Sequence, residues 1–160
     1  MEHVNHPRHY NARKDGMECI DIIRHYTCDI ANALKYLWRA GLKTDAGITD
    51  REKEIEDLKK AVWYINDQLY LGIDLDEFSG MSREDFDGMK EKIRSLTGRT
   101  PDEIASTEYY EEHVARSMFY LLQVGLIGDG YVYRIRTAVQ LLHRAIREIE
   151  IRIKQMEHED

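Results

Sequence analysis

Five polar residues at helical spacing are the clearest candidates for binding chemistry in this chain. Projected at about 100° per residue, they share one face of a helix that starts near Asp29, and the apolar side chains of that helix lie opposite. They are Asn32, Lys35, Tyr36, Arg39 and Lys43. Arginine binds phosphate oxygens through a planar fork and lysine through a point charge. The face therefore predicts a phosphate site, with an ordinary solvated helix face as the alternative.

Carboxylates three residues apart occur in two other segments. Glu18 and Asp21 form one pair, and Glu54 and Asp57 form the other; this spacing puts both acids of a pair on one helical face. Two such pairs facing each other could hold Mg²⁺, which prefers oxygen ligands. Structural ion pairs with Lys35 or Arg39 are the alternative and the stronger expectation.

The stretch NHPRHY, residues 5–10, is unusual for the start of a domain. His3, His6 and His9 are three apart, but Pro7 argues against one helix that carries all three as metal ligands. Histidine hydrogen-bonds bases and hydroxyls and, when protonated, pairs with phosphate, while Tyr10 can stack on a base. We expect either a ligand-contacting arm or a plain arm that packs over the rest of the protein.

The elements that must position these residues are all predicted to be helices. Apolar periodicity and capping signals predict helices over residues 16–26, 29–41, 49–69 and 82–96, one from Thr100 towards Gly125, and one over 132–156. Gly72–Gly80 reads as a turn-rich connector. No strand pattern competes, so the fold class is an all-α helical bundle.

The last of these segments carries a heptad-like apolar seam. Its members are Val132, Ile135, Val139, Leu142, Ile146, Ile149, Ile153 and Met156. The spacing fits either a helix packed inside a bundle or a subunit interface, and a homo-oligomer through this C-terminal helix is the partner that it suggests.

An ungapped shift of 84 residues aligns two parts of the chain. Residues 31–45 then lie over 115–129 with six identities, and Leu58, Ala61 and Ile65 lie over identical residues further on. The cations Lys35, Arg39 and Lys43 fall opposite Phe119, Gln123 and Ile127. Two related hairpins would thus differ in chemistry, the first polar and the second scaffold-like.

Composition limits the function classes. The chain has 160 residues, a net charge of −7 and two cysteines, which fits one domain with reduced thiols. The acidic balance argues against a nucleic-acid partner, which normally meets a basic face. No apolar run is long enough for a membrane span, and the polar N-terminus lacks a signal peptide, so a cytoplasmic location without a membrane partner is expected.

Four segments follow one another in a familiar order: NHPRHY, GMECIDII, NALKYLWRAGLK and DLKKAVWYI, between residues 5 and 65. Together they resemble a small family found mostly in bacteriophages and prophages, often labelled SaV-like and long described as a domain of unknown function. The resemblance covers residues 4–70. It separates a region 1–72, which would carry a nucleotide site, from a helical extension 73–160 in the same domain or at an oligomer interface.

The resemblance implies nucleotide chemistry, because the family includes a short-tailed coliphage enzyme that phosphorylates deoxynucleoside monophosphates without a Walker motif. It implies that the arm folds over the polar face, with Arg39, Lys35 and Asp57 as catalytic candidates. The implied nucleotide-binding residues are Asn5, His6, His9, Tyr10, Asn32, Lys35, Tyr36, Arg39, Lys43 and Lys60; those for Mg²⁺ are Glu18, Asp21, Glu54 and Asp57. For a phage-encoded chain the location would be the host cytoplasm.

Three functions remain open at this point, besides a pure scaffold. The first is a nucleoside monophosphate kinase, in which positioning and charge neutralisation carry the catalysis. The second is a protein that sequesters a nucleotide, such as a host defence signal, without altering it. The third is an all-α nucleoside triphosphate pyrophosphohydrolase, whose metal cage uses paired acids on a four-helix bundle.

Overall fold

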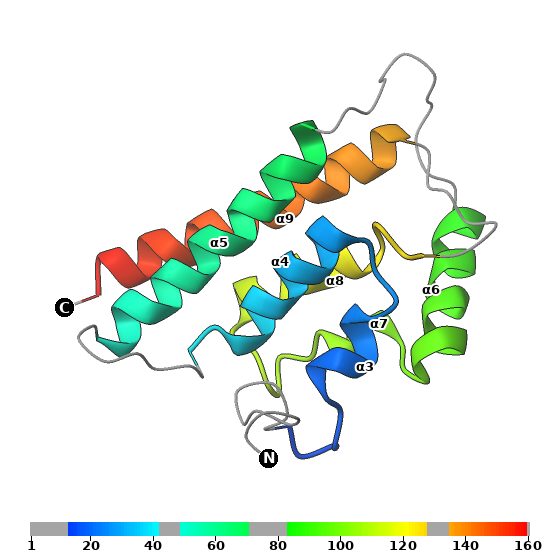
Figure 1. Cartoon of the computed structure of the whole chain (residues 1–160), viewed down its shortest axis with the longest axis horizontal. Helices are drawn as coiled ribbons and strands as arrows, with labels where there is room; N and C mark the ends of the chain where they lie inside the picture. Colours follow the sequence, from blue (N-terminus) through cyan, green and yellow to red (C-terminus); the bar gives the residue numbers. More distant parts are fainter. Residues whose placement is uncertain (1–12, 42–48, 71–82, 128–134, 160) are drawn as a thin grey trace.

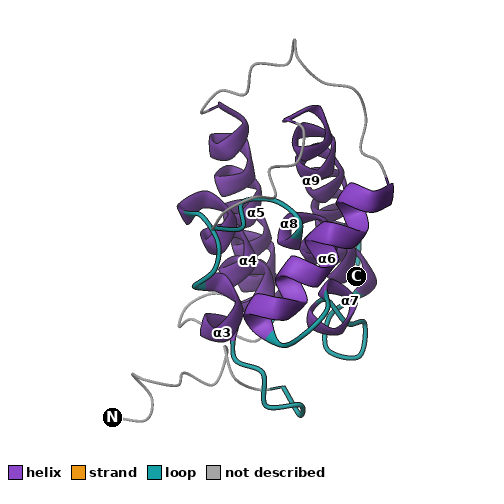
Figure 2. Ribbon diagram, turned by 90° about the vertical axis from the view of Figure 1, so that its right-hand side faces the viewer, coloured by secondary structure: helices purple, strands orange, loops and turns teal. Residues whose placement is uncertain are grey.

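The computed structural model describes residues 13–41, 49–70, 83–127 and 135–159. These residues form seven helices and no sheet (Figure 2), which confirms the all-α prediction. No helix among the described residues has both the length and the apolar character needed to cross a membrane.

The first helices follow their sequence signals closely. Helix α3 (Cys19–Ile23) is shorter than predicted and starts at a capping box between Glu18 and Asp21. Helix α4 (Cys28–Arg39) is followed by Gly41 at φ 82°, a left-handed conformation that glycine adopts without strain. Helix α5 (Asp50–Tyr70) starts at the predicted box, where Thr49 Oγ1 accepts the Glu52 N–H at 3.1 Å.

The second half contains one departure from prediction. Helix α6 (Arg83–Thr97) matches the predicted segment, but the helix expected from Thr100 to Gly125 is broken in two, α7 (Pro101–Ile104) and α8 (Glu112–Leu122). Arg13 donates hydrogen bonds to the carbonyls of Glu103 and Ile104 at 2.8 and 2.5 Å. A continuing helix would need those carbonyls for its next turn, so α7 ends there.

Four helices form the bundle (Figure 1). Helix α4 packs on α5 and α8, and α9 (Ile135–Glu157) packs on the same two helices. Backbone hydrogen bonds join the segment before α4 to the segment after α8, where Thr27 N–H donates to the Gly125 carbonyl and Ile127 N–H to the His25 carbonyl, each at 2.7 Å. One buried apolar cluster includes residues from all four helices.

The apolar seam of α9 faces this cluster. Leu142, Ile149, Ile153 and Met156 are buried, and Ile146 packs partly buried against the same core. For these residues the intramolecular explanation of the seam is therefore the one observed.

The two hairpins occupy equivalent positions in the bundle. A shift of 84 residues places Cys28 on Glu112, the first residue of α8, and places Asp50 one residue before the start of α9. Gly41 and Gly125 have nearly the same φ, 82° and 77°. The structure thus supports the aligned register of the two hairpins, whose polar residues can be compared position by position.

Candidate functional site

The polar face of α4 lies against α5 rather than in open solvent. The Tyr36 ring stacks on the Tyr64 ring of α5, with centroids 5.8 Å apart and an interplanar angle of 17°. Arg39 is only 6% exposed, although Asn32, Lys35 and Tyr36 are half-buried. The predicted polar face is therefore the polar contact surface between α4 and α5, called the α4/α5 seam below, and one edge of it is open to solvent.

A buried charge cluster lies at one end of this seam. Arg39 donates to Asp57 Oδ1 from Nη2 at 2.9 Å and from Nε at 3.2 Å. Lys53 Nζ lies 3.5 Å from the same oxygen, and Asp57 itself is 0% exposed. Asp57 Oδ2 has no hydrogen-bond partner in the described part of the chain. For Asp57, the predicted ion pair with Arg39 is the arrangement observed.

Three cations surround the Tyr36 ring. Lys35 Nζ lies 4.8 Å, the Arg39 guanidinium carbon 4.4 Å and Lys60 Nζ 5.5 Å from the ring centroid. Contacts of this kind are attractive because the ring face is negative. Lys60 also pairs with Glu56 at 2.7 Å. Because Arg39 is already paired with Asp57 and Lys60 with Glu56, the repulsion among the three cations is partly relieved, and an added anion would gain most from Lys35.

An exposed tryptophan extends this face along α5. Trp63 is 62% exposed and meets Tyr64 edge to face, with centroids 5.0 Å apart. A hollow of about 470 Å³ lies beside it, lined by Glu52, Ile55, Glu56, Lys59, Lys60 and Trp63. Trp63, Tyr64 and Lys53 were not predicted as site residues from the sequence. Their spacing from Lys60 and Asp57 along one helix was the sequence signal that could have identified them.

The four predicted metal ligands do not form one cage. Glu18 and Asp21 cap α3, where Asp21 Oδ2 accepts the Glu18 N–H at 3.1 Å. Glu54 faces α9, with Oε1 3.6 Å from Arg152, and burial raises its pKa despite that charge. Asp57 faces Arg39 on α4. This separation does not favour the pyrophosphohydrolase, which needs its acids together.

A different group of potential ligands lies at the start of α8. Among the described residues, Glu111, Glu112 and His113 bring their donor atoms within 4.8 Å of one another. Glu111 caps the helix by accepting from His113 N–H at 2.9 Å, and the His113 ring bonds Glu148 at 2.5 Å. Arg116 lies 3.4 Å from Glu112. These groups already satisfy one another, so the arrangement is explained without an ion.

Several predicted site residues cannot be placed. Asn5, His6, His9, Tyr10 and Lys43 lie outside the described residues, as does His3.

The second hairpin lacks this cluster. The positions equivalent to Lys35, Arg39, Lys53, Asp57 and Tyr64 hold Phe119, Gln123, Thr137, Leu141 and Glu148. Gln123, Thr137 and Leu141 are buried, as are Arg39, Lys53 and Asp57. Because the fold accepts mostly neutral residues at these places, the charges of the first hairpin are not required by the bundle architecture.

Comparison with known proteins adds one finding. Residues 4–66 match a family described as a protein of unknown function, DUF3310. The match covers less than half of the chain and includes α3, α4 and most of α5, but none of the second hairpin. No curated protein and no solved structure matches the chain.

Proposed function

We propose that this protein binds a nucleoside phosphate at the open edge of the α4/α5 seam and acts on it as a non-Walker nucleoside monophosphate kinase. The observation that carries the proposal is the ring of three cations around Tyr36 beside an exposed tryptophan. Cations for phosphate and an aromatic face for a base are the two components that a nucleotide site requires.

The proposed roles follow from exposure. Lys35 and Lys60 are half-buried and can reach a phosphate placed over the edge of Tyr36. Trp63 offers its exposed ring to the base. Arg39 is buried and paired with Asp57, so we do not assign it a direct contact with the phosphate. Its guanidinium lies over the Tyr36 ring, and its proposed role is to position that ring.

Kinase chemistry rests on the resemblance to the phage family and not on the geometry alone. Phosphoryl transfer depends mainly on positioning and on neutralising charge, which lysines can supply. In this proposal, Asn5, His6, His9, Tyr10 and Lys43 complete the site from the arm and from the segment after α4, and Mg²⁺ is introduced with the nucleotide. The proposed location is the host cytoplasm.

One observation favours a second candidate, a protein that sequesters a nucleotide unchanged. Two acids contact the cation cluster: Asp57 is fully buried and paired with Arg39, and Glu56 is paired with Lys60 at 2.7 Å and with Lys53 at 3.3 Å. Neither can therefore accept a proton from a substrate hydroxyl without giving up an ion pair. A homo-oligomer that closes the site from outside would suit this function.

The test combines a pool assay with matched variants. The protein is incubated with nucleoside mono-, di- and triphosphates and Mg²⁺, and both the pool and the protein-bound fraction are resolved by ion exchange and mass spectrometry. Conversion of a monophosphate to a diphosphate supports the kinase, whereas one nucleotide retained unchanged supports sequestration. An unchanged pool with nothing retained contradicts both.

Lys60→Ala and its counterpart Arg144→Ala distinguish a loss of binding at the proposed site from the general effect of removing one charge. Both residues occupy equivalent positions on α5 and α9, so each variant loses one charge from the same place in a hairpin. We expect Lys60→Ala and Lys35→Ala to weaken binding roughly tenfold or more, as is typical for a charge-assisted contact. Equal effects of Lys60→Ala and Arg144→Ala would contradict a site on the first hairpin.

A further inference from the structure

Two exposed aromatic side chains lie on one face of helix α5. Trp63 is 62% exposed and Tyr70 is 86% exposed, and their separation of seven residues places them on the same side of the helix. No other tryptophan, tyrosine or phenylalanine in the described ranges is exposed. Aromatic residues are enriched where proteins meet, so this face is a candidate docking surface.

The exposed face of α5 has the spacing of a helix-pairing seam. Its residues follow one another at alternating intervals of four and three, and each is exposed or half-buried. Together they form the outer stripe, which consists of Glu52, Glu56, Lys59, Trp63, Asn66 and Tyr70. The opposite side of α5, with Leu58, Ala61 and Ile65, is buried in the bundle. The spacing of the outer stripe therefore suits a further helix.

The hollow of about 470 Å³ beside Trp63 lies on this stripe. Its lining residues are Glu52, Glu56, Lys59 and Trp63 of the stripe, with Ile55 and Lys60 beside them. Glu56 and Lys60 are paired with each other at 2.7 Å, so these two charges are already met within the chain. The hollow has the place of a hole that receives a side chain from a partner helix.

A lysine lies on one side of Trp63 and a pair of acids on the other. Lys59, one turn before Trp63, is exposed, and its contact with Glu157 of α9 is long at 3.9 Å. Asp67, one turn after Trp63, lies against Asp29 of α4; burial, and then the hydrogen bond and charge of Asp67, raise the pKa of Asp29. Within the described part of the chain, neither of these carboxyl groups has a basic partner. A cation brought from outside would relieve this contact between two acids.

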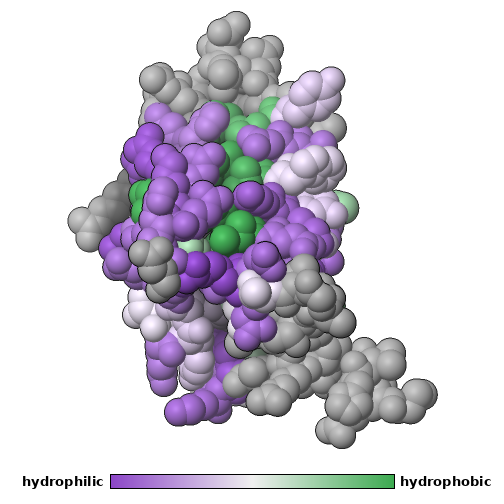
Figure 3. Space-filling model, turned by 90° about the vertical axis from the view of Figure 1, so that its left-hand side faces the viewer, coloured by the Kyte–Doolittle hydropathy of each residue, from purple (hydrophilic) through white to green (hydrophobic). Residues whose placement is uncertain are grey.

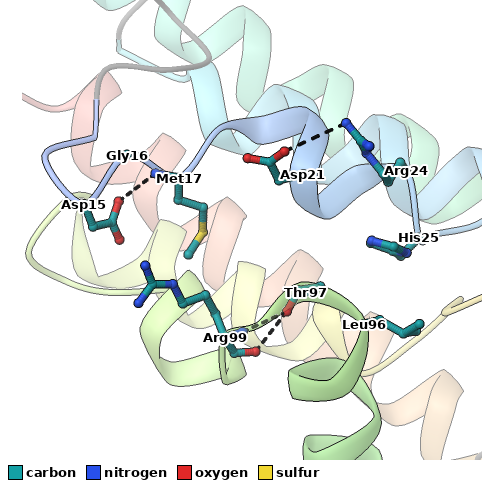
Figure 4. Close-up of a pocket in the computed structure, with 9 residues that line it drawn as sticks. All are labelled: Asp15, Gly16, Met17, Asp21, Arg24, His25, Leu96, Thr97 and Arg99. Atoms are coloured by element: carbon teal, nitrogen blue, oxygen red, sulfur yellow. Dashed lines mark hydrogen bonds and ion pairs between the residues drawn. The ribbon is translucent and has the colours of Figure 1, made fainter.

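The cavity of about 520 Å³ between α3 and the end of α6 is a contrasting case (Figure 4). The Arg24 guanidinium turns toward Asp21, with Nη2 3.8 Å from Oδ1, and the Arg99 guanidinium lies beside Asp15. Arg99 Nη1 also lies 3.6 Å from Glu103. The basic groups of this cavity are therefore met by acids of the same region, unlike the acids beside the outer stripe.

Two copies of the outer stripe are complementary when they run antiparallel. With the two Trp63 side chains at a two-fold axis, each residue faces the one equally far on the other side of Trp63. Lys59 of each copy then faces Asp67 of the other, which makes two opposite-charge contacts in one dimer. A parallel pair would set Lys59 against Lys59 and Asp67 against Asp67. Charge complementarity of this kind selects the orientation in which partners associate.

The same antiparallel register brings Tyr70 of one copy to the level of Glu56 in the other, over the hollow. Side chains of a helix lean toward its N-terminus. Because the two copies run in opposite directions, Tyr70 of one copy and Trp63 of the other lean toward each other across the hollow. Two aromatic rings in this arrangement suit a flat base between them.

We propose that a second copy of this chain docks antiparallel on the outer stripe of α5, with Lys59 of each copy against Asp67 of the other, and that its Tyr70 closes the hollow beside Trp63. The closing of the hollow over a base rests on the proposed nucleotide function, whereas the association of the two copies does not.

The association is tested on the full chain by sedimentation velocity without nucleotide, over a range of protein concentrations. We expect a monomer–dimer equilibrium. Lys59→Glu and Asp67→Lys should each weaken the dimer roughly tenfold or more, because like charges then face each other. The double variant reverses both members of each pair and should restore the dimer. A monomer at every concentration, or a double variant as weak as the single ones, would overturn the proposal.

The aromatic contacts are tested with Trp63→Ala and Tyr70→Ala, each of which should also weaken the dimer roughly tenfold or more. Ile151→Ala is the matched control, because Ile151 is an exposed apolar residue of α9 outside the outer stripe. It should leave the dimer unchanged. An equal loss in Ile151→Ala and Tyr70→Ala would overturn the assignment of the interface to α5.

Retention of nucleotide from a pool of nucleoside mono-, di- and triphosphates separates this inference from the proposed function. Asp67→Lys should retain less nucleotide than the unaltered protein, because Asp67 does not line the hollow and the variant lacks only the second copy. Equal retention would overturn the closing of the hollow by Tyr70. A dimer that retains no nucleotide would support the docking and contradict the proposed function, whereas a monomer that retains nucleotide would do the reverse.

Discussion

Arg39 was predicted from the sequence to be catalytic, but in the structure it has a structural role. Its guanidinium is the closest partner of Asp57, which is 0% exposed. Arg39→Ala would leave a buried carboxylate with only the longer contact to Lys53 at 3.5 Å. Breaking a buried pair from one side costs about 3–5 kcal/mol, so we expect a loss of roughly that size in urea unfolding.

The second hairpin supplies the control for that variant. Replacing the three charges together by the residues at the equivalent positions gives Arg39→Gln, Lys53→Thr and Asp57→Leu. Removing a whole buried charge cluster is often nearly neutral, so the triple variant should recover most of the lost stability. If it is as unstable as Arg39→Ala, the cost does not come from an uncompensated Asp57. Loss of activity in Arg39→Ala alone is therefore not evidence for catalysis.

A carboxyl pair at the other end of the seam predicts a pH effect. Burial, and then the hydrogen bond and charge of Asp67, raise the pKa of Asp29. The folded protein therefore holds a proton that the unfolded chain releases near its ordinary pKa of about 4. Stability should fall as the pH rises from that value through the raised pKa of Asp29.

Asp67→Asn should reduce this fall. The amide removes the neighbouring charge, and we expect up to about 1 kcal/mol of added stability at pH 7, measured by thermal unfolding between pH 3 and 8. Asp87→Asn, at an exposed position on α6, removes the same charge elsewhere and should leave the pH profile unchanged. A parallel change in both variants would point to net charge instead of the pair.

At the scale of elements, periodicity and caps predicted most helices because both act within a few residues. The Thr49–Glu52 box and the left-handed Gly41 appear where expected. The break between α7 and α8 was not predictable in this way, since residues 105–111 contain neither glycine nor proline. Arg13, some 90 positions earlier, takes the carbonyls of Glu103 and Ile104 and lies 4.2 Å from the Tyr109 ring centroid.

The candidate site was predicted in part for the same reason. Helical projection grouped Lys35, Tyr36 and Arg39 correctly, because these residues share one helix. It could not show that the face lies against α5, where Tyr64 and Asp57 become its partners. The paired acids were misleading as a group, because spacing within a helix does not specify which neighbouring helix each acid meets.

Gly125 tests the junction between the hairpins. It has φ 77°, and a Cβ there would lie 2.6 Å from Thr27 Oγ1 and Ile30 Cγ1. Gly98 has the same φ but nothing within 4 Å of such a Cβ. Gly98→Ala should cost about 1 kcal/mol for the backbone alone. Gly125→Ala should cost a further 1–3 kcal/mol or so for the clash, measured by urea unfolding; equal losses would mean that the junction yields freely.

At the scale of the whole molecule, the family match and the folding unit have different extents. The match ends at residue 66, within α5, yet α4 packs on α8 and α5 on α9. The apolar face of α4, which includes Leu34, Leu37 and Trp38, is buried in the cluster shared by both hairpins. The space-filling view in Figure 3 shows hydrophobic surface bordered by polar side chains on one face of the molecule.

A chain cut after residue 72 should therefore fail to fold alone. Without α8 and α9 it would expose Leu58, Ala61 and Ile65 together with the α4 face, and a single hairpin buries too little apolar surface to offset its conformational entropy. We expect no cooperative thermal transition by circular dichroism and poor dispersion in ¹H–¹⁵N NMR spectra. Adding the segment 73–160 should restore both signals through a non-covalent complex. If fragment 1–72 melts cooperatively and sediments as a monomer, the region matched by the family is a domain in its own right. If it melts cooperatively but sediments as a dimer, it gained that stability by pairing with a second copy of itself.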